Sequence, residues 1–372
     1  MIVETAWELT REKIIPVRAE LDEKNEFATS VMQDIAKADL FSIFIPEEYG
    51  GFGGGCFDMV LAMEQMARGC VGIATSFAAS ALGIYPVMIA GSKEMKEKYL
   101  PSVASGEKWA AFGLTEAGAG SDASGVKTTA VLDGDEWVLN GTKQWITNGG
   151  EAHIYSIVAM TDPQKGPRGA SIFVVEDGDP GFSYGKKENK MGIRSSATRE
   201  LIMKDCRIPK DRLVGRKGTG FITVMRTLDL SRPGIGSLGL GLGQAAVDEA
   251  VTYAKQRVQF GKPVIGFQAV QHMLADMATY LEAARALVYA AARHIDANPK
   301  GISKPSAMSK LFATDMAMKV TTDAVQVLGG YGYMKEYPVE KMMRDAKILQ
   351  IYEGTNQIQR NVIGQELNRE YA

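Results

Sequence analysis

Cysteine and histidine are scarce in this chain of 372 residues. The cysteines are too far apart for a disulfide framework or a zinc site and fit a reducing compartment: Cys56, Cys70 and Cys206. The histidines are equally isolated, and none has a second ligand at metal spacing: His153, His272 and His294. We therefore predict no metal site.

An excess of charge and a long apolar run are missing as well. The net charge is −2, and no long basic or acidic block occurs, which gives nucleic-acid or membrane-surface binding no electrostatic support. The longest apolar stretch, 71–90, contains Thr75, Ser76 and Ser80, so we predict a buried helix and no membrane span. The start of the chain has no basic n-region and no Arg-rich amphipathic pattern. We expect a cytoplasmic protein, or a mitochondrial matrix protein if a transit peptide has been removed.

The hydrophobic period changes twice along the chain. Apolar residues recur at helical spacing in the first segment, alternate in the second and return to helical spacing in the third. The length is sufficient for two or three domains. We predict an α+β fold that is mainly α: an N-terminal α-helical domain (1–110), a middle β-barrel domain (111–215) and a C-terminal four-helix-bundle domain (216–372).

Local signals refine the second and third segments. In the middle segment, Asp133-Gly134-Asp135 is a hairpin turn signal between alternating runs, and further short strands follow, typical of a small antiparallel barrel. In the last segment, four long alanine- and methionine-rich runs predict an antiparallel helical bundle. These runs are residues 235–259, 267–297, 304–328 and 355 to the end.

A single carboxylate, Glu353, lies in a break between two helical patterns near the C-terminus. Gly354 interrupts the pattern, and Thr355 is a good N-cap for the helix that follows. Partial dehydration against Ile351 and Tyr352 would raise the carboxyl pKa and make Glu353 a better proton acceptor. Taken alone, the spacing equally fits a residue that favours the positive end of the next helix.

Five motifs occur in the order seen in the acyl-CoA dehydrogenase family, which the chain resembles from about residue 15 to its end. They are 112–122 (FGLTEAGAGSD), 143–149 (KQWITNG), 257–263 (RVQFGKP), 326–332 (QVLGGYG) and 344–347 (RDAK), which leads into the Glu353 stretch. Ala117 stands where proline is common in the family, which would loosen that turn.

The resemblance implies that the chain binds FAD. It implies contacts to the flavin ring and pyrophosphate by Phe112, Leu114, Thr115, Gly120, Ser121, Trp145 and Thr147. It implies further cofactor contacts, partly across a subunit boundary, by Arg257, Phe260, Gln268, Gln326, Gly329, Gly330, Thr355 and Gln357. Without the resemblance, Trp145 would be interpreted as an aromatic of the barrel core and Arg257 as a charge at a helix C-terminus. Relatives are commonly homotetramers, so we expect a dimer of dimers.

The implied reaction is α,β-dehydrogenation of an acyl-CoA thioester. Glu353 would take the α-proton, and its own backbone N–H would help to stabilise the developing enolate. The implied substrate contacts are Ser121, Asp229, Arg232, Tyr352 and Gly354. Isovaleryl-type relatives carry the base at the position of Ser231, which cannot serve, so this assignment is disfavoured. Asp229 and Arg232 could instead form a surface ion pair at i,i+3.

Several alternatives remain open for the substrate and the electron acceptor. Residues 73–85 carry no charge, which disfavours a dicarboxylic acyl group. Their small side chains leave room for a branched or cyclic one. An electron-transferring flavoprotein is the expected partner. An oxidase or enoyl-CoA reductase of the same fold, and a non-catalytic flavoprotein scaffold, are the competing interpretations.

Overall fold

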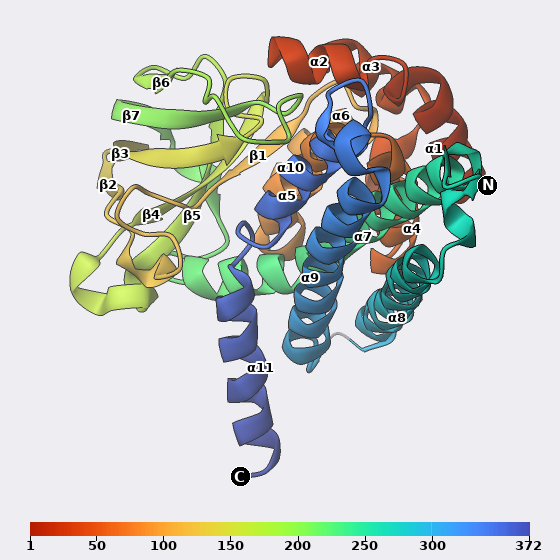
Figure 1. Cartoon of the computed structure of the whole chain (residues 1–372). Helices are drawn as coiled ribbons and strands as arrows, with labels where there is room; N and C mark the ends of the chain where they lie inside the picture. The colour runs from red at the N-terminus through yellow and green to blue at the C-terminus, as the bar shows by residue number, and fades with distance from the viewer. Residues whose placement is uncertain (299) are drawn as a thin grey trace.

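The computed structural model describes residues 1–298 and 300–372, and its N-terminal segment is helical, as predicted (Figure 1). Its α-helices are α1 (Ile2–Leu9), α2 (Arg18–Lys24), α3 (Thr29–Lys37), α4 (Cys56–Gly69), α5 (Val71–Ala90) and α6 (Lys93–Ala104). A π-helical turn, Thr10–Ile14, continues α1. The first strand begins a few residues after α6, at Ala110.

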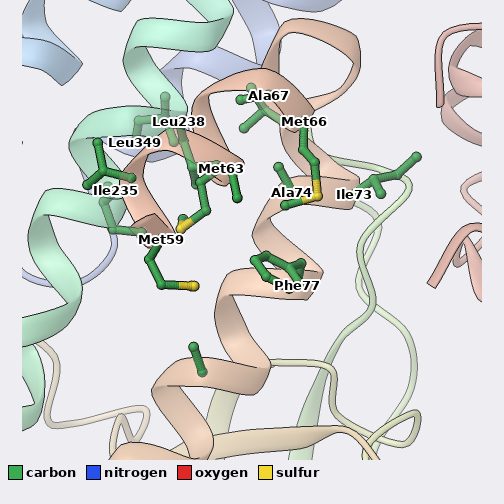
Figure 2. Packing of buried hydrophobic residues seen from close by; sticks show 14 of the residues in the cluster. Met59, Met63, Met66, Ala67, Ile73, Ala74, Phe77, Ile235, Leu238 and Leu349 are labelled. Carbon is green, nitrogen blue, oxygen red and sulfur yellow. The ribbon is translucent and has the colours of Figure 1, made fainter. Parts of the chain in front are cut away.

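Helix α5 is the central element of the core. By length and composition it could cross a membrane, but 67% of its most apolar window is buried inside the protein, as in the core helix of a soluble fold. Figure 2 shows Phe77 of α5 close to the methionines of α4, among them Met63 and Met66. On its other side α5 meets the sheet so closely that a Cβ at Gly83 would lie 2.5 Å from the backbone nitrogen of Ala111.

The middle segment forms one eight-stranded sheet in the order β6-β7-β3-β2-β4-β5-β8, with β1 paired to β4. The strands are β1 (Ala110–Gly113), β2 (Thr129–Asp133), β3 (Glu136–Thr147), β4 (Ile154–Met160), β5 (Ala170–Glu176), β6 (Phe182–Tyr184), β7 (Thr198–Pro209) and β8 (Leu213–Val214). The predicted hairpin is present, with Asp133 opposite Glu136. A fully antiparallel arrangement was wrong, because β1 and β2 both run parallel to β4. Closure of the sheet into a barrel stays a prediction.

The C-terminal segment is helical, as predicted, but its described residues, 216–298 and 300–372, form five α-helices where a four-helix bundle was expected. They are α7 (Gly220–Gln256), α8 (Gln268–Ala297), α9 (Ser303–Leu328), α10 (Val339–Leu349) and α11 (Asn356–Glu370). A small hairpin, β9 (Val258–Gln259) with β10 (Lys262–Pro263), links α7 to α8. Helix α10 packs against α9 and α7, and α11 also packs against α9 before its C-terminal end projects from the body (Figure 1). Of the residues in α11, Asn356 and Gln359 are buried.

Helix α7 begins fifteen residues before the predicted start at 235, and it carries Pro233 in its interior. A proline has no N–H, so it leaves the carbonyl four residues earlier without its helical donor. That carbonyl belongs to Asp229, and it accepts a hydrogen bond from the Ser306 hydroxyl of α9 at 2.6 Å. The neighbouring helix thus compensates for the proline, and residues 228–232 remain helical beside the cavity described below.

Candidate active site

A cavity of about 360 Å³ lies where the three segments meet. It is lined by residues of α5, the sheet, α7 and the loop before α11, among them Thr75, Phe112, Thr115, Trp145, Arg232, Tyr352 and Glu353. An adjoining cavity of about 670 Å³ shares Thr115, Trp145 and Glu353 and extends to Thr355 and Arg344. Glu353 therefore lies on the walls of both spaces.

The loop that carries Glu353 has a left-handed backbone. Glu353 has φ 53° and Gly354 has φ +90°, conformations that cost energy for most side chains and suit glycine. Thr355 then caps α11 as predicted, because its hydroxyl accepts a hydrogen bond from the Ile358 N–H at 3.2 Å. The turn exposes the side chain of Glu353 to the cavity and leaves its backbone N–H without an acceptor among the described residues.

Two buried side chains, Lys310 and Gln359, hold this loop through hydrogen bonds to its backbone. The Lys310 ammonium donates to the Gly354 carbonyl at 2.9 Å and to the Asn356 amide oxygen at 2.8 Å. The Gln359 amide donates to the same Gly354 carbonyl at 2.9 Å. Lys310 is fully buried, and burial lowers its pKa to about 7 even though Glu353 opposes the change. These bonds fix the strained turn in place.

Glu353 is partly buried at the cavity wall, and this burial raises the pKa of its carboxyl group above the usual value for glutamate. The Ser231 hydroxyl, the Arg232 guanidinium and the Lys310 ammonium act in the opposite direction. Ser231 contacts Oε2 directly. A carboxylate in this setting can accept a proton at a cavity wall.

A β-bulge places the predicted ring-facing residues of β3. The register between β3 and β7 shifts between Lys143 and Ile146, and Trp145 within the shift has φ 56°. Its side chain is 59% exposed, so the barrel-core interpretation of this tryptophan was wrong. The Gln144 N–H donates to the Thr115 carbonyl at 2.8 Å, which ties the two predicted flavin motifs together.

Beneath these motifs lies a buried ion pair. The Lys143 ammonium is 2.7 Å from Oε1 of Glu116 and 3.1 Å from the Leu114 carbonyl. Glu116 also accepts bonds from the Thr128 and Lys127 backbone N–H groups, at 3.0 and 2.7 Å. Burial lowers the pKa of Lys143 to about 8, and its charge holds the pKa of Glu116 below the usual range. The pair fixes the strand end that carries Thr115.

Most of the predicted site residues fall into two groups. The 360 Å³ cavity gathers Phe112, Leu114, Thr115, Gly120, Ser121, Trp145, Thr147, Arg232, Tyr352, Glu353 and Gly354, and Thr355 joins through the adjoining cavity. A separate cleft of about 680 Å³ gathers Arg257, Phe260, Gly329 and Gly330. Four predicted residues line none of these spaces: Asp229, Gln268, Gln326 and Gln357.

The interpretation of Asp229 and Arg232 as a surface ion pair was wrong, because Arg232 is 4% exposed. Its guanidinium is 2.8 Å from Asp229, and its Nε–H donates to the Glu353 carbonyl at 3.4 Å. Asp229 also accepts a 2.5 Å bond from the Ser303 hydroxyl. Arg232 therefore braces the Glu353 loop from α7, and Asp229 fixes Arg232.

The sequence did not reveal Lys310, Ser231 as a partner of Glu353, or the contact between the Thr75 hydroxyl and the Tyr352 hydroxyl at 3.2 Å. The available signal for Lys310 was its position among apolar residues of the helix 303–328. A lysine is rarely fully buried without a partner, so a lysine expected on a buried face should have indicated a specific contact. The other two contacts join residues more than 100 positions apart, and no local pattern encodes them.

Family models match nearly the whole chain. The N-terminal, middle and C-terminal domains of acyl-CoA dehydrogenase match residues 1–107, 111–206 and 218–368. The chain is 47% identical over 97% of its length to the probable acyl-CoA dehydrogenase FadE25 of Mycobacterium tuberculosis, covering 93% of that protein. It is 45% identical over 98% of its length to the short-chain specific acyl-CoA dehydrogenase of Megasphaera elsdenii, covering 96%. It is 45% identical over 99% of its length to acryloyl-CoA reductase (NADH) of Anaerotignum propionicum, covering 93%.

Solved structures agree with this assignment. Butyryl-CoA dehydrogenase from Megasphaera elsdenii superimposes with a TM-score of 0.96 at 44% identity, over 98% of this chain and 97% of that one. A chain in a structure of the electron transferring flavoprotein of Acidaminococcus fermentans gives 0.97 at 46% identity, with 99% and 97% covered. An acyl-CoA dehydrogenase complexed with FAD from Bacillus anthracis gives 0.94 at 35% identity, with 100% and 67% covered. The chain belongs to the acyl-CoA dehydrogenase family and is an oxidoreductase.

Proposed function

We propose that this enzyme oxidises an acyl-CoA thioester to the trans-2-enoyl-CoA, with Glu353 as the base and FAD as the electron acceptor in the site. The observation that carries the proposal is the placement of Glu353: one partly buried carboxylate, on a braced left-handed turn, at the wall of a cavity lined by the predicted flavin motifs. The relative solved as a complex with FAD supports the cofactor.

The cavity fits a flat, electron-poor ring with a polar edge. Trp145 presents an exposed indole, and Thr115 and Thr147 supply hydroxyl groups beside it. A Cβ at Gly120 would meet nothing within 4 Å, which leaves open space for a ligand next to the backbone. When bound, FAD would accept the β-hydrogen of the substrate as a hydride.

The residues of the chain then divide the remaining work. Glu353 takes the α-proton, for which burial makes it a stronger base than a solvated carboxylate. The Glu353 N–H, which has no acceptor among the described residues, is available to the thioester oxygen as negative charge develops there. Arg232 and Lys310 hold the loop so that both groups keep their positions.

The cavity supports a short, uncharged acyl group. Its α5 wall consists of Thr75, Ala78, Ala79 and Leu82 and carries no charge. Next to Glu353 lies a separate void of only about 20 Å³, lined by Met59, Met63 and Tyr85, which leaves little room there for a longer acyl chain. The names of the short-chain specific and butyryl-CoA relatives support the same range. Branched and cyclic groups of similar size remain candidates.

We also propose an electron-transferring flavoprotein as the physiological partner, supported by the likeness to a chain in a solved structure of such a flavoprotein. The cleft at Arg257 and Gly330 supports a homotetramer in which a second copy completes the cofactor site. The bacterial relatives are consistent with a cytoplasmic enzyme. The reductase relative favours one alternative direction, reduction of a short enoyl-CoA in the same cavity.

The deciding experiment is an anaerobic titration of the purified holoenzyme with straight, branched, cyclic and aryl acyl-CoAs. We expect loss of the flavin absorbance with acyl groups of about four carbons, the size named in the butyryl-CoA relative. An intact flavin spectrum with every acyl-CoA, together with reoxidation of the reduced enzyme by enoyl-CoA, would assign the reductase direction. No response to either would favour a non-catalytic flavoprotein, and rapid reoxidation by air would indicate an oxidase.

A further inference from the structure

Ser231 lies on α7 and, together with Glu353, lines a void of about 20 Å³ beside the cavity. Its hydroxyl contacts Oε2 of Glu353, and it also lies 3.2 Å from the Leu228 carbonyl of its own helix. A hydroxyl carries one hydrogen, so it can donate to only one of these oxygens at a time. An ionised carboxylate is the stronger acceptor of the two, because hydrogen bonds to charged groups are stronger than those between neutral groups.

The two carboxylate oxygens of Glu353 are therefore not equivalent. Oε2 has the Ser231 hydroxyl as its partner. Oε1 has no hydrogen-bond donor among the residues that the structure describes, although Glu353 forms part of the cavity wall. One oxygen is held, and the other is available to a group that enters the cavity.

We propose that Ser231 is a positioning residue for the base: its hydroxyl holds Oε2 of the ionised carboxylate and leaves Oε1 to accept the proton. The inference rests on the proposed function only in taking that proton to be the α-proton of an acyl-CoA. The hydrogen bond itself makes a claim about Glu353 that holds in the absence of any substrate.

The proton transfer balances as follows. The α C–H bond breaks and an O–H bond forms at Oε1, while the electron pair stays on the α-carbon as the enolate of the thioester. FAD, when bound, would accept the β-hydrogen with its electron pair as a hydride, and the α-carbon electron pair would then form the double bond of the enoyl thioester. Glu353 is then neutral, and the Ser231 hydroxyl can turn to the Leu228 carbonyl at 3.2 Å. The same hydroxyl thus has an acceptor in both protonation states of the base.

Other charged and titratable groups face Glu353 from every neighbouring element. They are Arg232 on α7, Lys310 on α9, Tyr85 on α5, Cys56 on α4 and Tyr352 in the adjoining loop. Arg232 and Lys310 lower the pKa of Glu353, as Ser231 does, against the larger effect of burial. They stay in place in a Ser231 variant, so a change in that variant reports on the hydroxyl alone.

Removal of the hydroxyl is expected to move the titration of Glu353 upward. Ser231→Ala takes away a charge-assisted bond that favours the ionised form, and we expect a shift of about one pH unit. Ser231→Thr keeps a hydroxyl and is expected to titrate like the wild type. Ser237→Ala is the matched control, because Ser237 is buried on the same helix and bonds the carbonyl three residues earlier at 2.7 Å, away from Glu353.

The first test is an infrared titration of the holoenzyme without substrate, in which the carboxylic acid band of Glu353 is assigned by its loss in Glu353→Gln. A higher midpoint in Ser231→Ala, with unchanged midpoints in Ser231→Thr and Ser237→Ala, supports the inference. Equal midpoints in all four proteins would overturn it, as would an equal shift in Ser231→Thr and Ser231→Ala. Flavin content and thermal unfolding establish that each variant is folded.

The second test is the pH dependence of anaerobic flavin bleaching by butyryl-CoA. The rate rises with pH as Glu353 ionises, so a higher pKa in Ser231→Ala moves this limb to higher pH by the same amount as the infrared midpoint. If the infrared midpoint shifts and the wild type is never bleached, Ser231 keeps its role and the proposed function fails. Bleaching with an unshifted infrared midpoint leaves the function intact and rejects the role of Ser231.

Discussion

The cavity around Glu353 and the cleft around Arg257 differ in how completely one copy of the chain covers them. In the cavity, Lys310 is fully buried and Arg232 is 4% exposed, and both bond the loop of the base. In the cleft, Phe260 is 94% exposed and Tyr331 is 45% exposed, with the Arg257 guanidinium 5.2 Å above the Tyr331 ring. Residues in both spaces were predicted to contact one cofactor, among them Thr115 and Trp145 in the cavity and Arg257 and Phe260 in the cleft.

This contrast separates the two tasks of the proposed site. The chemistry needs groups at fixed positions, and the chain fixes them with internal hydrogen bonds. The cleft presents exposed aromatic and apolar side chains, which is typical of a surface that another protein covers. The contrast therefore predicts that substitutions in the cavity affect chemistry within one copy, and that substitutions in the cleft affect cofactor retention and assembly.

Loss of the base tests the cavity most severely. Glu353→Gln removes the proton acceptor with little change in shape, and we expect anaerobic bleaching to slow by about 10³-fold or more while FAD stays bound. Glu8→Gln is the control, since Glu8 is an exposed carboxylate on α1. Bleaching at the wild-type rate in Glu353→Gln would remove the cavity from the chemistry.

We expect the next largest effect from loss of Lys310, which braces the Glu353 loop. Lys310→Met leaves the Gly354 carbonyl and the Asn356 amide oxygen without this donor, and we expect the free energy of unfolding to fall by about 2 kcal/mol. Bleaching should slow as well, because the turn at Glu353 loses a support. Lys304→Met, at a lysine that is 27% exposed and bonds Glu370, is the control. Denaturant unfolding measures the stability of both variants and of the wild type. If Lys310→Met were as stable as the wild type, the hydrogen bonds of Lys310 would contribute nothing to stability.

The difference in unfolding free energy between the wild type and Lys310→Met should depend on pH in a defined direction. The native pKa of Lys310 is about 7, and its value in the unfolded chain is the ordinary 10.5. Between these values the unfolded chain holds a proton that the native protein has lost, so Lys310 makes stability rise with pH in this window. Its contribution is lost as pH falls through 7. The stability advantage of wild type over Lys310→Met should therefore grow from pH 7 to pH 10, and a flat difference would contradict the assigned pKa.

The two regions also differ in how far the sequence predicted them. The order of helical and strand segments follows from hydrophobic period, and the cap at Thr355 follows from residue type. The long C-terminal helices were predicted where alanine- and methionine-rich runs continue without a break. Helix α7 was predicted too short because a proline such as Pro233 normally ends a helix. The Ser306 hydroxyl replaces the hydrogen bond that the Asp229 carbonyl loses, and these two residues are 77 positions apart in the sequence.

The site shows the same limit. The motifs identified most residues of the cavity wall, since each motif is a local run. They did not predict the bulge at Trp145, the buried Lys310 brace or the partner of Oε2, because these depend on elements packed together in three dimensions. The division of the cofactor residues between two spaces is likewise a property of the fold.

Arg257→Ala tests the cleft with a smaller expected effect. If a second copy completes the cofactor site, loss of this cation should weaken FAD binding about tenfold, because bonds to charged phosphate oxygens contribute that order of free energy. Fluorescence titration of the apoprotein with FAD measures the change, and Arg216→Ala, at an exposed arginine after the sheet, is the control. Bleaching of the FAD-saturated variant should keep its wild-type rate. A loss of rate at saturation would place Arg257 in the chemistry and end the division between cavity and cleft.

Thr75→Val gives the smallest expected effect and tests whether the cavity wall itself is tuned. The substitution keeps the shape and removes the hydroxyl that lies 3.2 Å from the Tyr352 hydroxyl, next to the base. One neutral hydrogen bond contributes on the order of 1 kcal/mol, so we expect the KM for butyryl-CoA to change by about fivefold or less, with the bleaching rate at saturation nearly unchanged. Tyr352→Phe removes the other partner and should give a similar value, and the double variant should add little because the bond is already lost. Thr279→Val, at an exposed threonine of α8 that bonds only its own helix, is the control. Additive losses in the double variant would mean that the two hydroxyls act independently on the substrate, and the cavity would then be less tightly braced at Tyr352 than it is at Glu353.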